Sequence, residues 1–289
     1  MSNIIFEFVL PAVLFLMMFT MGLSLTLADF QRVFKFPKAV GLGLFNQLLV
    51  LPCVAFSLVA IFDLAPELAI GMMILSACPG GIVSNAISYF GKADVALSIS
   101  LTAIVSLIAL ITMPTITAFA VSHFGASDSM GPFPYLTLMT TLMLITVIPV
   151  SSGMLLRAQL PSFAERALPL LDKVTGLLFL GVVCAAVINT WDEAIANLPA
   201  LGLVLVSLGM ILLLWGVGTS KLFGLPAKSG ATIAFETSIQ NVATAILIGG
   251  TVLQNPGYYL PAALYGIIMY IPAGILVFYM RRRFSDSEL

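Results

Sequence analysis

One acidic residue, Glu236, lies inside an apolar segment of the chain. The segment "SGATIAFETSIQNVATAILIGGTVL" is otherwise apolar enough to cross a bilayer. A charge near the middle of a membrane costs roughly 3 kcal/mol on insertion scales, so such a residue normally has a partner. No basic residue is an evident partner, and we therefore expect Glu236 to bind a cation. Carriage of a proton by the same carboxylate remains the alternative.

Two apolar segments are interrupted by polar residues. The first interruption, "CPGGIVSNAIS" at 78–88, contains a proline followed by two glycines, which weaken a helix. The second, "FETSIQNVAT" at 235–244, has neither residue type. Both end in an amide at a matching place, Asn85 and Asn241, which suggests an inverted repeat of two broken helices.

Oxygen-bearing side chains gather around these interruptions. Ser98 and Thr102 are four residues apart and share one face of the helix that follows the first break. Hard oxygen donors with a single carboxylate suit a monovalent cation such as Na⁺. The predicted first Na⁺ site consists of Ser84, Asn85, Ser98, Thr102 and Glu236. Alternatively, hydroxyls in membrane helices bond to their own helix or join it to a neighbour.

A second cation site is predicted beside the first. Gln47, in "LGLFNQLLVLP", can join Gln240 and the backbone around Thr237 and Ile239, next to Glu236. Amide and carbonyl oxygens are again ligands for an alkali cation. Asn46, Gln47 and Asn85 are alternatively polar contacts between helices.

The composition is that of a polytopic membrane protein. Of 289 residues, 60% are hydrophobic and 9% are charged, far from the balance of a soluble domain. Apolar runs that can span about 30 Å predict an all-α fold of nine helices in one transmembrane domain, 1–289. The predicted helices are 4–27, 37–62, 68–90, 94–121, 133–156, 167–190, 198–222, 230–253 and 257–280. We expect the first run to remain in the mature protein, because it is too long for a signal peptide and has no cleavage site.

The charged residues predict the orientation. With the N-terminus outside, all 12 Lys and Arg fall in or beside the inside loops, including Lys173 with Arg157 and Arg166. The opposite loops carry only acidic residues, among them Asp63 and Asp128. This distribution follows the positive-inside rule and places the C-terminus in the cytoplasm.

Several other functions are disfavoured. The three cysteines have no paired spacing, so they predict buried packing residues and neither a disulfide framework nor a metal cluster. The basic loops are explained by topology and lack the aromatic or polar groups of a nucleic-acid surface. Neither paired acids, a His cluster nor a serine with a base indicates an enzyme. No obligate protein partner is evident.

Three stretches resemble the bile acid:sodium symporter family over almost the whole chain. They are "MFTMGLSLTLADFQRV", "ILSACPGGIVSNAISYFGKADVALSISLTAIVSLIAL" and "FETSIQNVATAIL". The resemblance implies a core domain with two crossed, unwound helices and a panel that moves against it. It also implies uptake of an organic anion with Na⁺, commonly two ions. By position, the two ion sites are the residue sets given above.

The resemblance also has departures. Bacterial members often have ten helices, and this chain resembles the nine-helix arrangement that lacks the first. The last helix, "LPAALYGIIMYIPAGILVFYM", offers few polar side chains for bile acid, so pantoate, pyruvate or another small carboxylate is equally plausible.

We expect a bacterial-type symporter of the inner (plasma) membrane that works by alternating access. Asn241 and Ile82 are its predicted substrate contacts, lying where half-helix ends can face an anion. A proton-coupled transporter or exporter of the same fold is the alternative.

Overall fold

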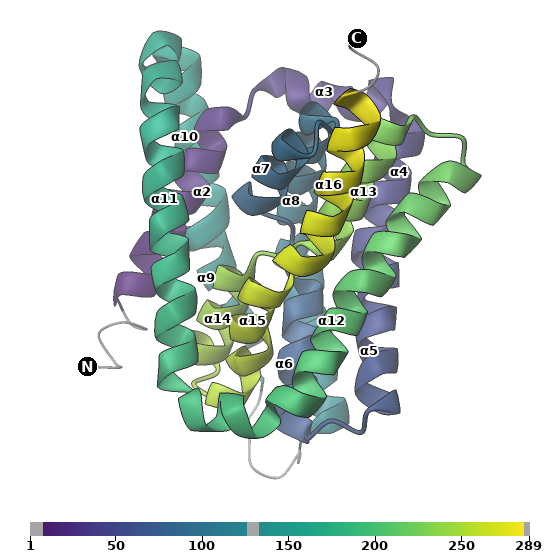
Figure 1. The fold of residues 1–289 in the computed structure, drawn as a ribbon. Coiled ribbons are helices and arrows are strands. Elements are labelled where there is room, and N and C mark those ends of the chain that lie inside the picture. The colour runs from purple at the N-terminus through teal and green to yellow at the C-terminus, as the bar shows by residue number, and fades with distance from the viewer. Residues whose placement is uncertain (1–7, 126–132, 286–289) are drawn as a thin grey trace.

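The computed structural model describes residues 8–125 and 133–285 (Figure 1). Throughout these residues the regular structure is helical, as predicted, with no strand. The helices, including three π-helical turns (η), are α2 (Leu10–Ser24), α3 (Leu27–Lys35), α4 (Pro37–Phe45), η2 (Asn46–Val50), α5 (Leu51–Ile61), α6 (Pro66–Ala77), α7 (Ile82–Phe90), α8 (Val95–Phe124), α9 (Tyr135–Leu142), η3 (Met143–Val147), α10 (Ile148–Gln159), α11 (Pro161–Asn189), α12 (Trp191–Leu222), α13 (Ala227–Ser238), α14 (Val242–Leu247), η4 (Ile248–Val252), α15 (Pro256–Ile268) and α16 (Tyr270–Ser285).

The helices account for the predicted membrane spans in order. Seven segments of the described chain are long and apolar enough to cross a membrane, and the bent pair α6 and α7 makes an eighth. The first predicted span contains α2, an apolar helix of 15 residues that is shorter than a full crossing. A polytopic membrane fold is confirmed, whereas the count of nine stays a prediction.

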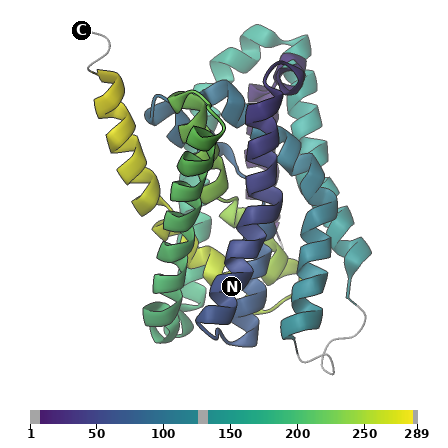
Figure 2. The same cartoon turned by 90° about the vertical axis from the view of Figure 1, so that its right-hand side faces the viewer.

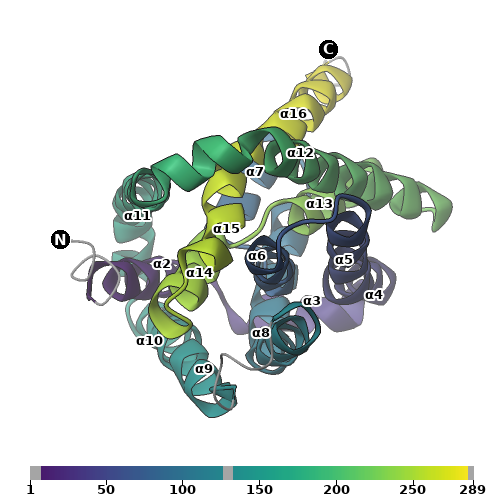
Figure 3. The ribbon, with the colours of Figure 1, turned by 90° about the horizontal axis from the view of Figure 1, so that it is seen from below.

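The helices form two groups. We call α2, α9, η3, α10 and α11 the panel, and the remaining helices the core. Helices α2, α10 and α11 pack on one another at one side of the bundle, as Figures 1 and 3 both show. Close backbone approach holds α2 against α10, because a Cβ atom at Gly22 or at Gly153 would overlap backbone atoms of the other helix. The C-terminal end of α16 points away from the rest of the bundle (Figure 2).

Two interrupted segments run through the core in opposite directions. The first is α6 and α7, which meet at an angle of 65° around residues 78–81. In the second, α13 ends at Ser238 and α14 begins at Val242, although no proline or glycine stands between them. In Figure 1, α7 and α13 occupy the upper half of the core and α6 and α14 the lower half. The two breaks predicted from sequence are therefore present and antiparallel.

The charged ends are sorted as the sequence predicts, with two differences. Helix α3 and the end of α16, which carry basic residues, both lie at the upper end in Figure 1. The first inside loop, however, is the amphipathic helix α3, and Lys173 is part of α11 instead of a loop. Helix α11 begins at Pro161, six residues earlier than predicted, so Lys173 lies well inside the helix. Asp128 lies outside the described residues.

Candidate functional site

Glu236 is buried at the centre of the core and is held by hydroxyl groups. It lies on α13, of which every residue from Gly230 to Ser238 is buried. The hydroxyl of Ser98 donates a short hydrogen bond to Oε1, and Thr102 Oγ1 donates to Oε2 at 2.8 Å. Ser98 and Thr102 stand four residues apart on α8, one helical turn, so both reach the same carboxylate.

These two hydroxyls differ from other hydroxyls of the same helix. Ser100 and Ser106 bond to carbonyl oxygens one turn earlier in α8, which is the usual behaviour in membrane helices. Ser98 and Thr102 instead point across to α13. The alternative of bonding to their own helix thus does not describe this pair, whereas the alternative of joining two helices does, because both hydroxyls connect α8 to α13.

The cluster around Glu236 contains more acceptor oxygens than hydroxyl protons. Ser98 Oγ lies 2.8 Å from Asn85 Oδ1 while also contacting Glu236, yet it carries one proton. Thr102 Oγ1 likewise lies near both acceptors, at 3.5 Å from Asn85 Oδ1. The hydroxyl of Ser84 donates to Gly81 O at 2.7 Å, and Ser88 Oγ donates to Ser98 Oγ at 3.3 Å. A buried surplus of oxygen lone pairs is the chemistry that a hard cation satisfies.

The first break brings its backbone against the carboxylate. A Cβ atom on Gly80 would lie 2.5 Å from Glu236 Oε2 and 3.2 Å from Ser84 Oγ. Only glycine leaves that space, so the Pro-Gly-Gly sequence both interrupts the helix and lets α13 approach. All five residues predicted for the first Na⁺ site are therefore brought together around the crossing.

The second predicted set also assembles, through amide groups. Gln47, on the π-helical turn η2, donates from Nε2 to Gln240 Oε1 at 2.8 Å and to Cys78 O at 3.0 Å. Gln240 Nε2 in turn donates to Thr237 O at 2.8 Å. This chain of donors fixes the orientation of both amides and leaves Gln47 Oε1 buried without a partner. A buried acceptor of this kind requires an explanation, and a cation supplies one.

Glu236 and Ile239 of the second set, and the predicted substrate contact Asn241, lie at or beside the second break. The described hydrogen bonds of Glu236 all go to the first set, and none reaches Gln47 or Gln240. Ile239 is extended at the break, with φ −111° and ψ 117°. Asn241 caps α14, its Oδ1 accepting from Thr244 N at 3.2 Å, so part of its amide serves the helix terminus.

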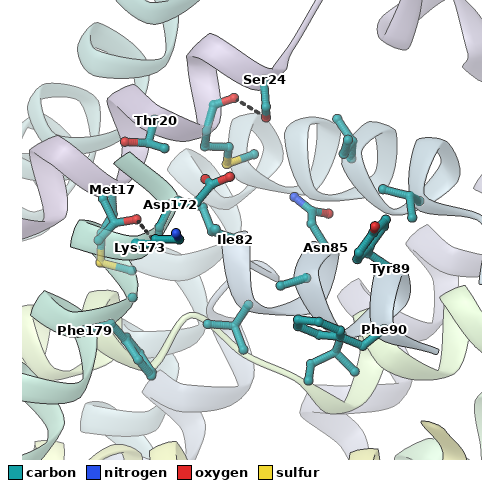
Figure 4. Close-up of a pocket in the computed structure, with 18 of the residues that line it drawn as sticks. Met17, Thr20, Ser24, Ile82, Asn85, Tyr89, Phe90, Asp172, Lys173 and Phe179 are labelled. Carbon is teal, nitrogen blue, oxygen red and sulfur yellow. Dashed lines mark hydrogen bonds between the residues drawn. The ribbon is translucent and has the colours of Figure 1, made fainter. Parts of the chain in front are cut away.

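An apolar cavity of about 600 Å³ lies between the panel and the core (Figure 4). Residues of α2 and α11 form one wall and residues of α7 form the other, with Asn85 and Tyr89 facing Thr20 and Phe179 across it. Asn85 belongs both to this wall and to the oxygen cluster of Glu236. Ile82, a predicted substrate contact, lines the cavity, whereas Asn241 does not.

Some residues around the site have no counterpart in the sequence reasoning. Tyr265 of α15 is fully buried and donates its hydroxyl to Ser238 O at 2.6 Å, at the end of α13. A lone tyrosine in an apolar segment gives no signal of this contact. Cys78 is buried as predicted, but Cys53 and Cys184 are exposed, so packing inside the protein does not explain them. No cluster of His, Cys, Asp or Glu suited to a metal occurs in the described part of the chain.

Antiparallel interrupted spans, a buried carboxylate at their crossing and a cavity beside it define a membrane transporter of the inverted-repeat class. The family assignment follows from sequence comparison. The model of the Sodium Bile acid symporter family matches residues 11–198, and the chain belongs to this family.

Similar proteins are sodium-dependent transporters by name. The probable sodium/metabolite cotransporter BASS2, chloroplastic, of Oryza sativa subsp. japonica is 28% identical over 92% of this chain and 62% of its own length. The ileal sodium/bile acid cotransporter of Homo sapiens is 28% identical over 83% of this chain and 68% of its own. The uncharacterized sodium-dependent transporter YocS of Bacillus subtilis (strain 168) is 26% identical over 94% and 83%.

The chain spans 62% of the length of the BASS2 relative from Oryza sativa subsp. japonica. It spans 65% of the length of a second chloroplast relative, the probable sodium/metabolite cotransporter BASS1 of Arabidopsis thaliana, which is 28% identical. Membership of a symporter family confirms the prediction of a membrane transporter in place of an enzyme. The family match also confirms the resemblance to the bile acid:sodium symporter family that the sequence motifs indicate.

Proposed function

We propose that the protein is a sodium-coupled symporter of an organic anion that works by alternating access, with two Na⁺ for each substrate. One observation carries the proposal: the hydroxyl groups of Ser98 and Thr102 each lie near two acceptor oxygens, of Glu236 and of Asn85, although each carries a single proton. Na⁺ bound by Ser84, Asn85, Ser98, Thr102 and Glu236 neutralises the carboxylate and fills this surplus.

The second ion is proposed beside Gln47. Its Oε1 atom is a buried acceptor without a partner, and the carbonyl groups of Thr237 and Ile239 flank the same break. Gln240 completes the set. Glu236 contributes to this site through its charge, because its described hydrogen bonds go to the first set.

The anion is proposed to bind in the cavity between panel and core. Asn85 joins the cavity to the first ion site, so Na⁺ bound there orders the cavity wall and adds positive charge beside it. Ile82 contributes apolar contact, and Asn241 acts by holding the start of α14 next to the crossing. Movement of the panel against the core then exposes the cavity to the other side of the membrane.

The proposed stoichiometry supplies a useful driving force. A tenfold Na⁺ gradient is worth about 1.4 kcal/mol for each ion. Two Na⁺ with a monovalent anion carry one net positive charge, and a potential near 100 mV adds about 2.3 kcal/mol. The total of about 5 kcal/mol supports accumulation of several thousandfold.

We place the transporter in the plasma membrane, the inner membrane of a bacterium, with its C-terminus in the cytoplasm. The sorting of basic residues to one end supports this orientation.

Thermal stability in Na⁺ against K⁺, at fixed ionic strength, tests the ion site in purified protein. A ligand that binds the folded state raises its melting temperature. Wild type should be stabilised by Na⁺, Glu236→Gln should lose the response, and the control Glu165→Gln, an exposed carboxylate of α11, should keep it. A wild type that ignores Na⁺ and responds to pH through Glu236 would instead support a proton-coupled transporter of the same fold.

A further inference from the structure

Two charged residues of the panel line the cavity. Asp172 and Lys173, both on α11, are the charged members of the cavity wall, and the residues around them are mainly apolar. Figure 4 shows them on the wall opposite Asn85 and Tyr89. Lys173 follows the start of α11 at Pro161 by twelve residues, which is about 18 Å of helix. Both residues are thus deep within a membrane-spanning helix.

Neither side chain has a partner inside the described protein. Within residues 8–125 and 133–285, no ion pair or side-chain hydrogen bond holds the carboxylate of Asp172 or the ammonium of Lys173. The one hydrogen bond to Asp172 goes from Thr175 Oγ1 to its backbone oxygen. Adjacent residues on a helix do not face each other, so the two charges are presented separately. Unpaired charges in a membrane span indicate a pathway or binding site by default.

The neutral polar groups of the cavity divide into occupied and open ones. The hydroxyls of Thr20, Ser24 and Thr175 donate to carbonyl oxygens of their own helices. Asn85 has its Oδ1 in the ion cluster, and among the described residues its Nδ2 donates no hydrogen bond. The charged groups of Asp172 and Lys173 and the amide donor of Asn85 are therefore open, and the lining residues Tyr89 and Tyr270 also carry hydroxyls, in a wall that is mainly apolar.

The geometry points to Asp172 and Lys173 as the polar subsite for the substrate, which we infer to be a carboxylate that also carries a hydroxyl group. Lys173 binds the carboxylate, with Asn85 Nδ2 on the opposite wall, and Asp172 accepts the hydrogen bond of the second group. The remaining apolar wall takes the hydrocarbon body. This inference rests on the proposed transport function and names the chemistry of its substrate.

Charged thiol reagents test the subsite without knowledge of the substrate. Ala86 lines the cavity and is exposed, so Ala86→Cys is a conservative reporter. The exposed Cys53 and Cys184 are first replaced by serine, whereas Cys78 is buried. Rates of modification are measured in purified protein with a sulfonatoethyl methanethiosulfonate (anion) and a trimethylammonioethyl methanethiosulfonate (cation). Each rate is divided by that of neutral methyl methanethiosulfonate.

Lys173→Met should slow the anionic reagent relative to the neutral one by roughly threefold to tenfold, because a charge in a narrow cavity concentrates counterions. Lys173→Arg, which keeps the positive charge, should leave the relative rate of the anionic reagent at its wild-type value. Asp172→Asn should slow the cationic reagent relative to the neutral one, again by roughly threefold to tenfold. Arg166→Met removes a charge from the same helix outside the cavity and should change neither ratio.

Unchanged ratios in both cavity variants would overturn the subsite. So would an equal effect of Arg166→Met, or a reporter that reacts with none of the reagents, since the cavity would then be closed to water. Stabilisation by Na⁺, measured on the same variants without any reagent, confirms folding and reports separately on the ion site. If the rate ratios do not change but Na⁺ still stabilises the protein, the subsite is wrong and the sodium proposal stands. If the ratios change as expected but Na⁺ does not stabilise the protein, the sodium proposal is wrong and the subsite stands.

Discussion

The backbone N–H of Asn241 donates a 2.9 Å hydrogen bond to the carbonyl oxygen of Pro79. The donor belongs to the second break and the acceptor to the first, so the two interruptions satisfy each other where no regular helix can. Residues about 160 positions apart thereby meet at one point. The groups proposed to bind the first ion, on α7, α8 and α13, are arranged around that point.

Gly80→Ala should weaken Na⁺ binding at the first site. The new Cβ would lie 2.5 Å from Glu236 Oε2, so the carboxylate or the break must shift. We expect at least a tenfold loss of apparent Na⁺ affinity, about 1.4 kcal/mol. Na⁺ titrations of the melting temperature measure it. Gly41→Ala is the matched control, because a Cβ there meets nothing within 4 Å. Equal affinities for both variants would contradict the close approach.

Gln47→Leu should remove the second ion while leaving the first. The substitution deletes the buried Oε1 acceptor and also leaves Cys78 O and Gln240 Oε1 without their donor. Loss of buried partners costs about 1–3 kcal/mol of stability. In proteoliposomes, the dependence of uptake on Na⁺ concentration should change from sigmoidal to hyperbolic. A sigmoidal curve that persists in the variant would place the second ion elsewhere.

Tyr265→Phe should destabilise the end of α13. The variant removes only the hydroxyl that donates to Ser238 O, at a fully buried position. Leaving that carbonyl unsatisfied should cost about 1–3 kcal/mol, seen as a lower melting temperature. Tyr279→Phe provides the comparison, since Tyr279 is 55% exposed. If both variants have the melting temperature of the wild type, the hydroxyl of Tyr265 does not stabilise the end of α13.

Transport should be driven by membrane potential as well as by Na⁺. Two Na⁺ with a monovalent anion move one net positive charge inward. A negative-inside potassium diffusion potential, set with valinomycin in proteoliposomes, should therefore accelerate uptake of a radiolabelled monocarboxylate. The compound is chosen beforehand as one that raises the melting temperature of the purified protein in Na⁺ buffer. Uptake that ignores the potential would indicate one Na⁺ for each anion.

The sequence is sufficient for much of this architecture. Apolar runs give the spans in order, and Pro79 with two glycines gives the first break directly, because these residues cannot continue a helix comfortably. The second break is predicted from its polar cluster and from its likeness to the first, and the structure places it at residues 239–241. Its cause is tertiary: a carbonyl from the first break accepts the amide that a helix would otherwise use.

Some features could not be read from residue types. Lys173 is counted with the positive-inside residues although it falls within the predicted helix 167–190, and only the packing of α2 beside α11 places it in a cavity. In the same way, the direction of the Glu236 carboxylate depends on which hydroxyls of α8 face it. Side-chain direction across two helices is a property of their packing.

The segment that carries Glu236 is enclosed by protein on all sides. The most apolar stretch of Ala227–Val252 is entirely buried, whereas that of α11 is only 28% buried. Lipid chains therefore touch the panel and the outer helices of the core, such as α12, but do not reach the segment that carries Glu236. A change in bilayer thickness or in acyl-chain composition acts on these outer helices through their exposed surfaces. The affinity of the ion site should accordingly be the same in thin and thick membranes, while the rate of panel movement varies with the lipid.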